Sequence, residues 1–393
     1  MGKRPIAYVL DIAANRVETA AGADMRALRR EGHAVQAITL RHTPDDFQTA
    51  GRPSDDGVLS IGCTDAGRTS LEILRLYRRS AEVRRGLSFL RAQLTQPRCR
   101  LLWNSAKLAT RAQAAGCRHL HAHGAGEAAA HALVAARMIG ASVSFTSCGD
   151  DVYGDAPDLR EMLRVADFAV APCRDMAANL MGMVPSARIV TIPRGVEPNR
   201  FAPRPEDMPD NGRYLFVGRL VEQAGLDDLL DALGMIPTSR RPALDVVGAG
   251  PDAAALRERA AARGLTETVR FLDTRPESWM AAEGPRYRAL VGPFKAARTG
   301  EHDADPLPVK EAMAMGLPVI ASRFMGNKDT VTMGTGILFE PGDALGLAAS
   351  VLALESMPPA QRRAMGDAGR AHILEHFPTS RQAAALSRMI EAA

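Results

Sequence analysis

The sequence has few aromatic residues, no long apolar run and little net charge, and each of these absences excludes a class of function. Aromatic residues make up 5% of the 393 residues, and no motif that would stack on bases is present, so we expect no nucleic-acid partner. No run approaches the roughly 20 apolar residues that a membrane-spanning helix needs. The formal net charge of +4 is too small to indicate an acidic or a basic partner by itself.

The five cysteines are scattered, without the paired spacing of a disulfide framework or a zinc site. The basic start of the chain, Met1–Arg4, is followed by an apolar run at residues 6–10 that is too short for a signal peptide. We therefore expect a reduced, cytoplasmic protein whose cysteines fill the core.

Short apolar runs alternate with Ala-, Arg- and Leu-rich helical stretches along the whole chain. This alternation predicts an α/β fold in which crossover helices join parallel strands. The length favours two large domains. We predict Rossmann-like domains over residues 1–200 and 212–375, joined by a Pro- and acid-rich linker at 201–211. The expected strands are residues 6–10, 34–40, 118–122, 142–146, 168–171, 189–192, 214–217, 244–247, 269–272, 289–291, 318–321 and 336–339.

The most informative segment, residues 300–322, contains an acidic loop, a short helix and a buried strand. Pro306 disfavours helix at the residue before it, so Asp303 is expected in a loop. Pro308 fits the first turn of a helix over residues 309–315, and Gly316 is expected to end it in the left-handed conformation.

The start of this helix is a candidate anion site. Free backbone amides near Leu307 suit a diphosphate, while Glu311 and Asp303 lie on either side of it and can reach hydroxyl groups. A ribose–diphosphate–sugar ligand has that layout. An ordinary helix N-terminus preceded by acids is the alternative explanation.

The chain resembles the family 4 glycosyltransferases, which are retaining enzymes with two Rossmann-like domains. The likeness rests on Asp303 and Glu311, eight positions apart, and on the order and spacing of motifs along most of the chain. It looks most like the polysaccharide-assembly subgroup, including the colanic-acid type. The segments that carry it are residues 121–123, 145–153, 157–168, 192–201, 216–226, 247–251, 292–293, 300–322 and 336–343.

The resemblance implies a GT-B fold, with two domains facing a cleft and a C-terminal helix, residues 376–393, that packs back on the first domain. It implies transfer of a sugar from a UDP- or GDP-linked nucleotide-sugar to a glycan or lipid-linked acceptor in polysaccharide biosynthesis. The donor would bind the second domain and the acceptor the first. No metal or other cofactor is implied, because cations and a helix N-terminus neutralise the diphosphate.

The donor side is assigned residue by residue. The resemblance gives Arg219 the role of stabilising the leaving diphosphate, Asp303 the sugar hydroxyls and Glu311 the ribose hydroxyls. Gly218, after an expected strand, lets the backbone approach a phosphate, and a guanidinium binds phosphate through two hydrogen bonds. Gly248 matches the next strand-to-loop turn, and Leu307 and Pro308 open the diphosphate helix. An ordinary surface arginine is the alternative for Arg219.

Two departures from the family bear on activity. Ala224 occupies the position of a lysine, and losing a comparable charge-stabilising donor costs on the order of 3–4 kcal/mol in the transition state. We predict that Lys310 or Lys295 supplies the missing cation, with Arg298 as a further candidate; ordinary solvated charge explains both lysines equally well. Cys148 replaces a histidine that faces the donor sugar, and a thiol is a poor hydrogen-bond donor.

The acceptor side is less well defined. Asp151 fits the family's acid in the loop after the fourth expected strand, and Asp150 beside it is weak evidence for a metal. His121 and His123 should share one face of a strand; we expect them to line the acceptor cleft, although polarity beneath a covering helix is equally compatible. Glu18 lies at the start of the first helix, where the family's loop approaches the donor.

The segment from Arg68 to Arg118 is markedly basic, with leucines and phenylalanine interleaved, and predicts an amphipathic helix pair. It fits either a solvated arginine-rich surface or peripheral contact with an anionic membrane that holds a lipid-linked acceptor.

Two other functions stay open. One is a catalytically weakened family member that binds nucleotide-sugar or glycan as a partner or regulatory subunit, for which Ala224 and Cys148 are the evidence. The other is a sugar-nucleotide epimerase of similar two-domain fold, which would need no acceptor.

Overall fold

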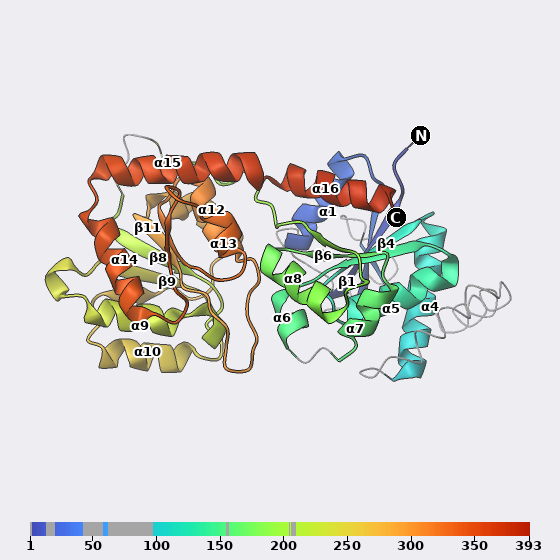
Figure 1. Ribbon diagram of the computed structural model, residues 1–393, viewed down its shortest axis with the longest axis horizontal. Helices are drawn as coiled ribbons and strands as arrows, with labels where there is room; N and C mark the ends of the chain where they lie inside the picture. Colours follow the sequence, from blue (N-terminus) through green and yellow to red (C-terminus); the bar gives the residue numbers. More distant parts are fainter. Residues whose placement is uncertain are drawn as a thin grey trace. The chain divides into compact units, whose positions relative to one another are not determined.

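The computed structural model describes residues 2–12, 20–41, 58–61, 97–154, 157–203, 205 and 210–393. The chain divides into two compact units, Met1–Ile192 with Gln382–Ala393, and Pro193–Arg381. Each unit is a parallel sheet covered by helices (Figure 1). The prediction of two Rossmann-like α/β domains is therefore confirmed.

In the described part of the first unit, seven parallel strands lie in the order β3-β2-β1-β4-β5-β6-β7. Helices on both faces leave little of the sheet in contact with water, which favours strands of continuous apolar sequence. The strands are β1 Ile6–Ile12, β2 Val35–Arg41, β3 Leu59–Ser60, β4 His119–His123, β5 Ser142–Thr146, β6 Phe168–Ala171 and β7 Ile189–Thr191. The helices are α1 Ala20–Arg30, α4 Arg98–Ala114, α5 Glu127–Ile139, α6 Gly149–Tyr153, α7 Leu159–Val165 and α8 Arg174–Met183.

The last helix, α16 (Thr379–Glu391), completes the first unit. Its apolar residues Ala383, Leu386 and Ile390 join the core around Ile6 and Tyr8. Polar contacts add to this packing, since the hydroxyl of Ser387 on α16 lies 2.8 Å from His33 Nε2 and 3.0 Å from Lys3 Nζ. The expected return of the C-terminal helix to the first domain is thus confirmed.

Among the residues that the structure describes in the second unit, six parallel strands lie in the order β10-β9-β8-β11-β12-β13. The strands are β8 Arg213–Val217, β9 Ala243–Val247, β10 Val269–Phe271, β11 Ala289–Gly292, β12 Val319–Ser322 and β13 Ile337–Phe339. The α-helices are α9 Leu226–Met235, α10 Ala253–Ala262, α11 Glu277–Glu283, α12 Leu307–Ala314, α13 Asn327–Thr330, α14 Ala344–Ser356 and α15 Pro359–His376. Short 3-10 turns are η2 Glu222–Ala224, η3 Thr238–Arg240 and η4 Gly284–Arg286.

The helices of the second unit cover both faces of its sheet (Figure 1). On one face α9 packs against α10 and α14, and on the other α12 packs against the long helix α15. The core is formed by side chains of the strands and of these helices, among them Phe216, Leu230, Val246, Met313 and Val351.

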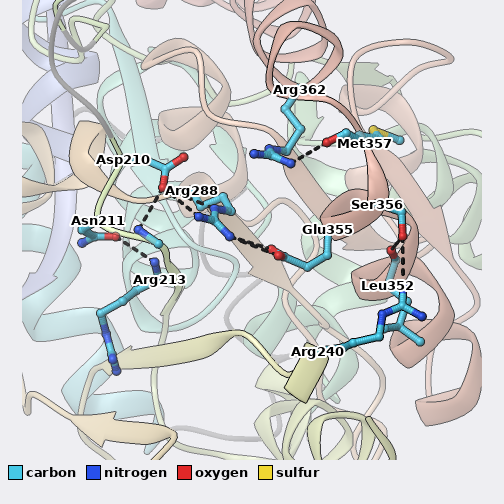
Figure 2. Close-up of polar contacts among 11 residues, drawn as sticks. Asp210, Asn211, Arg213, Arg240, Arg288, Leu352, Glu355, Ser356, Met357 and Arg362 are labelled. Atoms are coloured by element: carbon cyan, nitrogen blue, oxygen red, sulfur yellow. Dashed lines mark hydrogen bonds and ion pairs between the residues drawn. The ribbon is translucent and has the colours of Figure 1, made fainter. Parts of the chain in front are cut away.

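Ion pairs tie the amino ends of the strands to the covering helices. Arg288, just before β11, bonds to Asp210 ahead of β8 at 3.2 Å and to Glu355 of α14 at 3.1 Å (Figure 2). A cavity of about 250 Å³ opens beside them, lined by Pro285, Arg288, Pro318 and Arg362 among others. It lies at the amino edge of the sheet, opposite the residues assigned to the donor.

Candidate functional site

The donor candidates all follow the carboxyl ends of three strands of the second sheet, β8, β9 and β11. Strands β8 and β11 are neighbours, with Leu215 opposite Leu290. From β8 the chain continues to β9 on one side, and from β11 it continues to β12 on the other. The loops at the carboxyl ends of β8 and β11 therefore separate, and ligands of open α/β sheets bind in the crevice that this reversal leaves.

The loop after β8 is held close to the loop after β9. The amide of Gly218 donates to the carbonyl oxygen of Val247 at 3.1 Å. Gly248 has a φ of +149°, and a Cβ there would lie 1.8 Å from the carbonyl oxygen of Gly218. The glycine is thus required for the close approach of these two loops, and Arg219 is left exposed at the end of β8.

The helix expected after the acidic loop is α12. It begins at Leu307, with Pro306 before it and Pro308 in its first turn, and Gly316 just beyond it has a φ of +74°. Asp303 Oδ1 accepts a hydrogen bond from the amide of Asp305 at 3.0 Å. Asp303 and Glu311 are both half-buried, so part of each residue remains in contact with the surface.

Lys310 lies inside the protein. Its side chain is 1% exposed, and its ammonium bonds to Asp305 Oδ2 at 2.6 Å and donates to the carbonyl oxygen of Arg194 at 2.9 Å. Burial raises the pKa of Asp305, and the ammonium of Lys310 opposes that rise. In this conformation Lys310 has almost no surface with which to meet a diphosphate.

Two further cations lie near the position of the missing lysine. Ala224, which occupies that position, is buried in η2. The amide of Lys295 donates to the carbonyl oxygen of Gln223, the residue before Ala224, at 3.0 Å. Lys295 Nζ is 2.8 Å from Asp227 and 2.9 Å from Asp228.

The ion pairs made by Lys295 and by Arg298 differ in exposure. Burial lowers the pKa of Lys295, but the hydrogen bonds to Asp227 and Asp228 outweigh it and raise the pKa overall. Arg298 is 92% exposed, with Nε 3.0 Å from a carboxylate oxygen of Glu222. Lys295 is therefore held by two acids, whereas Arg298 makes a surface ion pair beside the same turn.

Acidic side chains meet at the carboxyl edge of the first sheet. Asp151 accepts a hydrogen bond from the amide of Ala125 at 2.9 Å, and Asp11 accepts one from the amide of Ala128. Burial, then Glu127 and Asp151, raise the pKa of Asp11 to about 6. Asp11 was not among the residues expected from the sequence, although an acid directly after the apolar run 6–10 was a signal for it.

The histidines of β4 form part of a cross-strand ladder with β5. His121 is fully buried, and its ring nitrogens lie 2.8 Å from Ser144 Oγ and 3.0 Å from Thr146 Oγ1. Burial lowers the pKa of His121 well below its ordinary value, so the ring is neutral. It has no surface with which to contact an acceptor, whereas His123 is half-buried and bonds to Tyr8 at 3.1 Å.

The remaining candidates are placed in part. Cys148 follows β5, is half-buried, and is not part of a disulfide among the described residues. Glu18 and residues 68–96 of the basic segment lie outside the described residues, whereas α4 lies in the described remainder of that segment. In the ranges that the structure covers, no group of three or more His, Cys, Asp or Glu residues is arranged to hold a metal. Over the same ranges, no helix has the length and apolarity to span a membrane.

Comparisons with known proteins give a consistent picture. Residues 203–372 match the family model described as glycosyl transferases group 1. The chain is 31% identical over 274 residues to a GDP-mannose-dependent alpha-(1-6)-phosphatidylinositol monomannoside mannosyltransferase of Mycobacterium tuberculosis, covering 62% of this chain and 69% of that protein. The enzyme of the same name from Mycolicibacterium smegmatis is 31% identical over 245 residues, covering 58% of this chain. The chain spans 62% of that relative's length.

The whole fold also has close structural counterparts. A crystal structure of HepE from Anabaena, in complex with UDP-glucose, matches 99% of this chain and 100% of its own, with a TM-score of 0.73 and 15% identity. At that identity the likeness concerns the fold, and it covers both units of the chain.

Proposed function

Since the chain belongs to the glycosyl transferases group 1 family, we propose that it moves a hexosyl group from a nucleotide-sugar to a lipid-linked or glycan acceptor, with retention of anomeric configuration. The observation that carries the proposal is topological: Arg219 follows β8 and α12 follows β11, the two strands between which the strand order reverses. A guanidinium and free helix amides at one point are suited to a diphosphate.

In this proposal the leaving diphosphate binds the amides at the start of α12 and the guanidinium of Arg219. Glu311 takes the ribose hydroxyls and Asp303 the hydroxyls of the transferred sugar. Charge develops on the bridging oxygen as the glycosidic bond breaks, and preorganised donors stabilise it without reorganisation. The acceptor hydroxyl attacks from the face that the diphosphate leaves and passes its proton to the departing diphosphate oxygen. Attack from that face retains the configuration.

GDP-mannose is the first donor to test, because two mycobacterial relatives are named as GDP-mannose-dependent enzymes. A UDP-sugar is the alternative. The names of the same relatives favour a lipid-linked acceptor over a soluble glycan. We accordingly place the reaction in the cytoplasm at an anionic membrane surface, where the basic segment of residues 68–118 would contact lipid.

The second cation for the diphosphate is, in our proposal, Arg298 rather than either lysine. Removing Lys310 from its buried partner would cost about 3–5 kcal/mol, and Lys295 is already paired with two carboxylates. The exposed pair between Arg298 and Glu222 contributes little to stability, so the guanidinium can exchange a carboxylate for a phosphate at small cost.

Thermal-shift measurements test the donor site first. Stabilisation grows with ligand concentration relative to the dissociation constant, so UDP-, GDP-, ADP- and TDP-sugars can be ranked without knowing the acceptor. We expect one nucleotide class to raise the unfolding temperature, GDP first, and the Arg219→Ala variant to lose most of that rise. No rise with any nucleotide-sugar at millimolar concentration would refute the proposal.

A catalytically weakened partner protein is the second candidate, favoured by Ala224 together with the ion pairs of Lys295 and Lys310. Release of nucleoside diphosphate separates the two. Slow release from the bound donor, stimulated by an acceptor, supports the transferase, whereas tight donor binding without release supports the weakened member. Conversion of free donor to another sugar would instead indicate an epimerase.

A further inference from the structure

A buried ion pair lies between the two acids assigned to the donor. Asp305 and Lys310 are 2% and 1% exposed, with 2.6 Å between Oδ2 and Nζ. Replacing a buried ion pair by apolar residues is often neutral or stabilising. Fold stability alone therefore does not account for two charges at these positions, and a role in fixing geometry is the better explanation.

The pair is connected to both acids. Asp303 accepts a hydrogen bond from the amide of Asp305 at 3.0 Å, and Glu311 directly follows Lys310 in α12. The ion pair therefore joins the two ends of the segment 305–310, which contains two prolines whose φ angles are fixed. Closing this segment sets the separation of the two carboxylates.

The same pair is anchored to a distant part of the second unit. The amide of Arg194 donates to Asp305 Oδ2 at 3.0 Å, and the carbonyl oxygen of Arg194 accepts from Lys310 Nζ at 2.9 Å. The ammonium also lies 4.8 Å from the ring centre of Phe377, and the amide of Val196 donates to the carbonyl oxygen of Phe377. The segment 305–310 is thus held against the place where residues 194–196 and 377–379 pair through backbone hydrogen bonds.

We propose that Asp305 and Lys310 are positioning residues: their buried bond, fixed to Arg194, holds Asp303 and Glu311 at the spacing that a nucleotide-sugar requires. The inference rests on the proposed function for its ligand. It assigns no direct contact with substrate to either residue. It also explains the burial of Lys310, because the ammonium acts on the donor site through the loop and helix that it joins.

The test separates fold stability from donor affinity. The double variant Asp305→Leu with Lys310→Met replaces the pair by apolar side chains, and Lys310→Met alone leaves the buried acid without its partner. We expect the double variant to unfold within a few degrees of wild type while its affinity for the nucleotide-sugar falls at least tenfold. Affinity within twofold of wild type in the double variant would overturn the proposal.

A second measurement applies if the double variant does not fold. Asp305→Glu keeps the charge and lengthens the side chain, and amide hydrogen exchange without ligand reports on the loop directly. We expect faster exchange across residues 300–308 in Asp305→Glu, with α15 unchanged as an internal control. Unchanged exchange in the loop would also overturn the proposal.

Failure of the proposed function has a different outcome. If wild-type protein binds no nucleotide-sugar, the proposed function fails, and hydrogen exchange alone then decides whether the pair positions the loop. Lys310→Arg gives a conservative comparison, since it retains a cation; recovery of donor affinity relative to Lys310→Met shows that the charged link is what the loop requires.

Discussion

Asp11 allows a quantitative prediction about the first unit. Its pKa is raised from 3.8 to about 6, which corresponds to about 3 kcal/mol at 1.36 kcal/mol for each pKa unit. Because the carboxyl is partly exposed, solvent screening reduces this to about 1–2 kcal/mol. The folded protein holds the proton more tightly than the unfolded chain, so the ionised carboxylate costs stability. That cost is absent below about pH 4, grows as the pH rises towards 6 and is constant above it.

The Asp11→Asn variant should therefore gain stability relative to wild type as the pH rises. Asparagine retains an oxygen that accepts from the amide of Ala128, and it cannot ionise. The chain has two tryptophans, Trp103 in α4 and Trp279 in α11, so a Trp279→Phe background leaves Trp103 to report urea unfolding of the first unit.

The difference in unfolding free energy between variant and wild type should rise by about 1–2 kcal/mol between pH 4.5 and pH 7.5. The same comparison for Glu161→Gln, on α7 away from this cluster, controls for general loss of negative charge. A difference that stays flat with pH, or that grows towards acid, would refute the assignment of a raised pKa to Asp11.

Three further predictions concern the second unit. Arg219→Ala should lower kcat about 10²–10³-fold, equivalent to about 3–4 kcal/mol, and Arg219→Lys should recover only part of it because lysine cannot bind phosphate through a planar fork; an unchanged kcat would remove Arg219 from the site. Arg298→Ala should lower kcat/KM at least tenfold, and a larger loss in Lys295→Ala would assign the second cation to that lysine instead. Gly225→Ala should destabilise the second unit by more than about 3 kcal/mol, because its φ is +71° and a Cβ would lie 1.8 Å from the carbonyl oxygen of Pro293. The matched control Gly264→Ala, with a φ of +66° and open space, should cost only about 1–2 kcal/mol, and equal losses in urea unfolding would contradict the close approach.

Much of the fold follows from local sequence pattern. Strands β5 and β6 were predicted to the residue, and all of their residues except Ser142 are buried, as expected of strands covered on both faces. The helix α12 begins two residues earlier than expected, at Leu307, and this start still leaves Pro308 in the first turn, where its missing N–H is not needed. Strand β3 was not predicted, because two residues, Leu59 and Ser60, carry no period.

The site was predictable only where its parts are close in sequence. The acids and prolines around α12 form one segment, so their order was visible. The burial of Lys310 was not, because its partner Arg194 is 116 residues away. Similarly, Asp11 and Asp151 come together only because β1 and β4 are neighbours and β4 is followed by β5 in the sheet, and no local pattern specifies that order.

The most direct test of the donor site is a crystal structure of the protein with a nucleoside diphosphate bound at a concentration that saturates it in solution. We predict a diphosphate within hydrogen-bond distance of the Arg219 guanidinium and the first amides of α12, with the ribose towards Glu311. A diphosphate in the cavity beside Arg288 and Arg362, or an empty carboxyl edge at β8 and β11, would contradict the account.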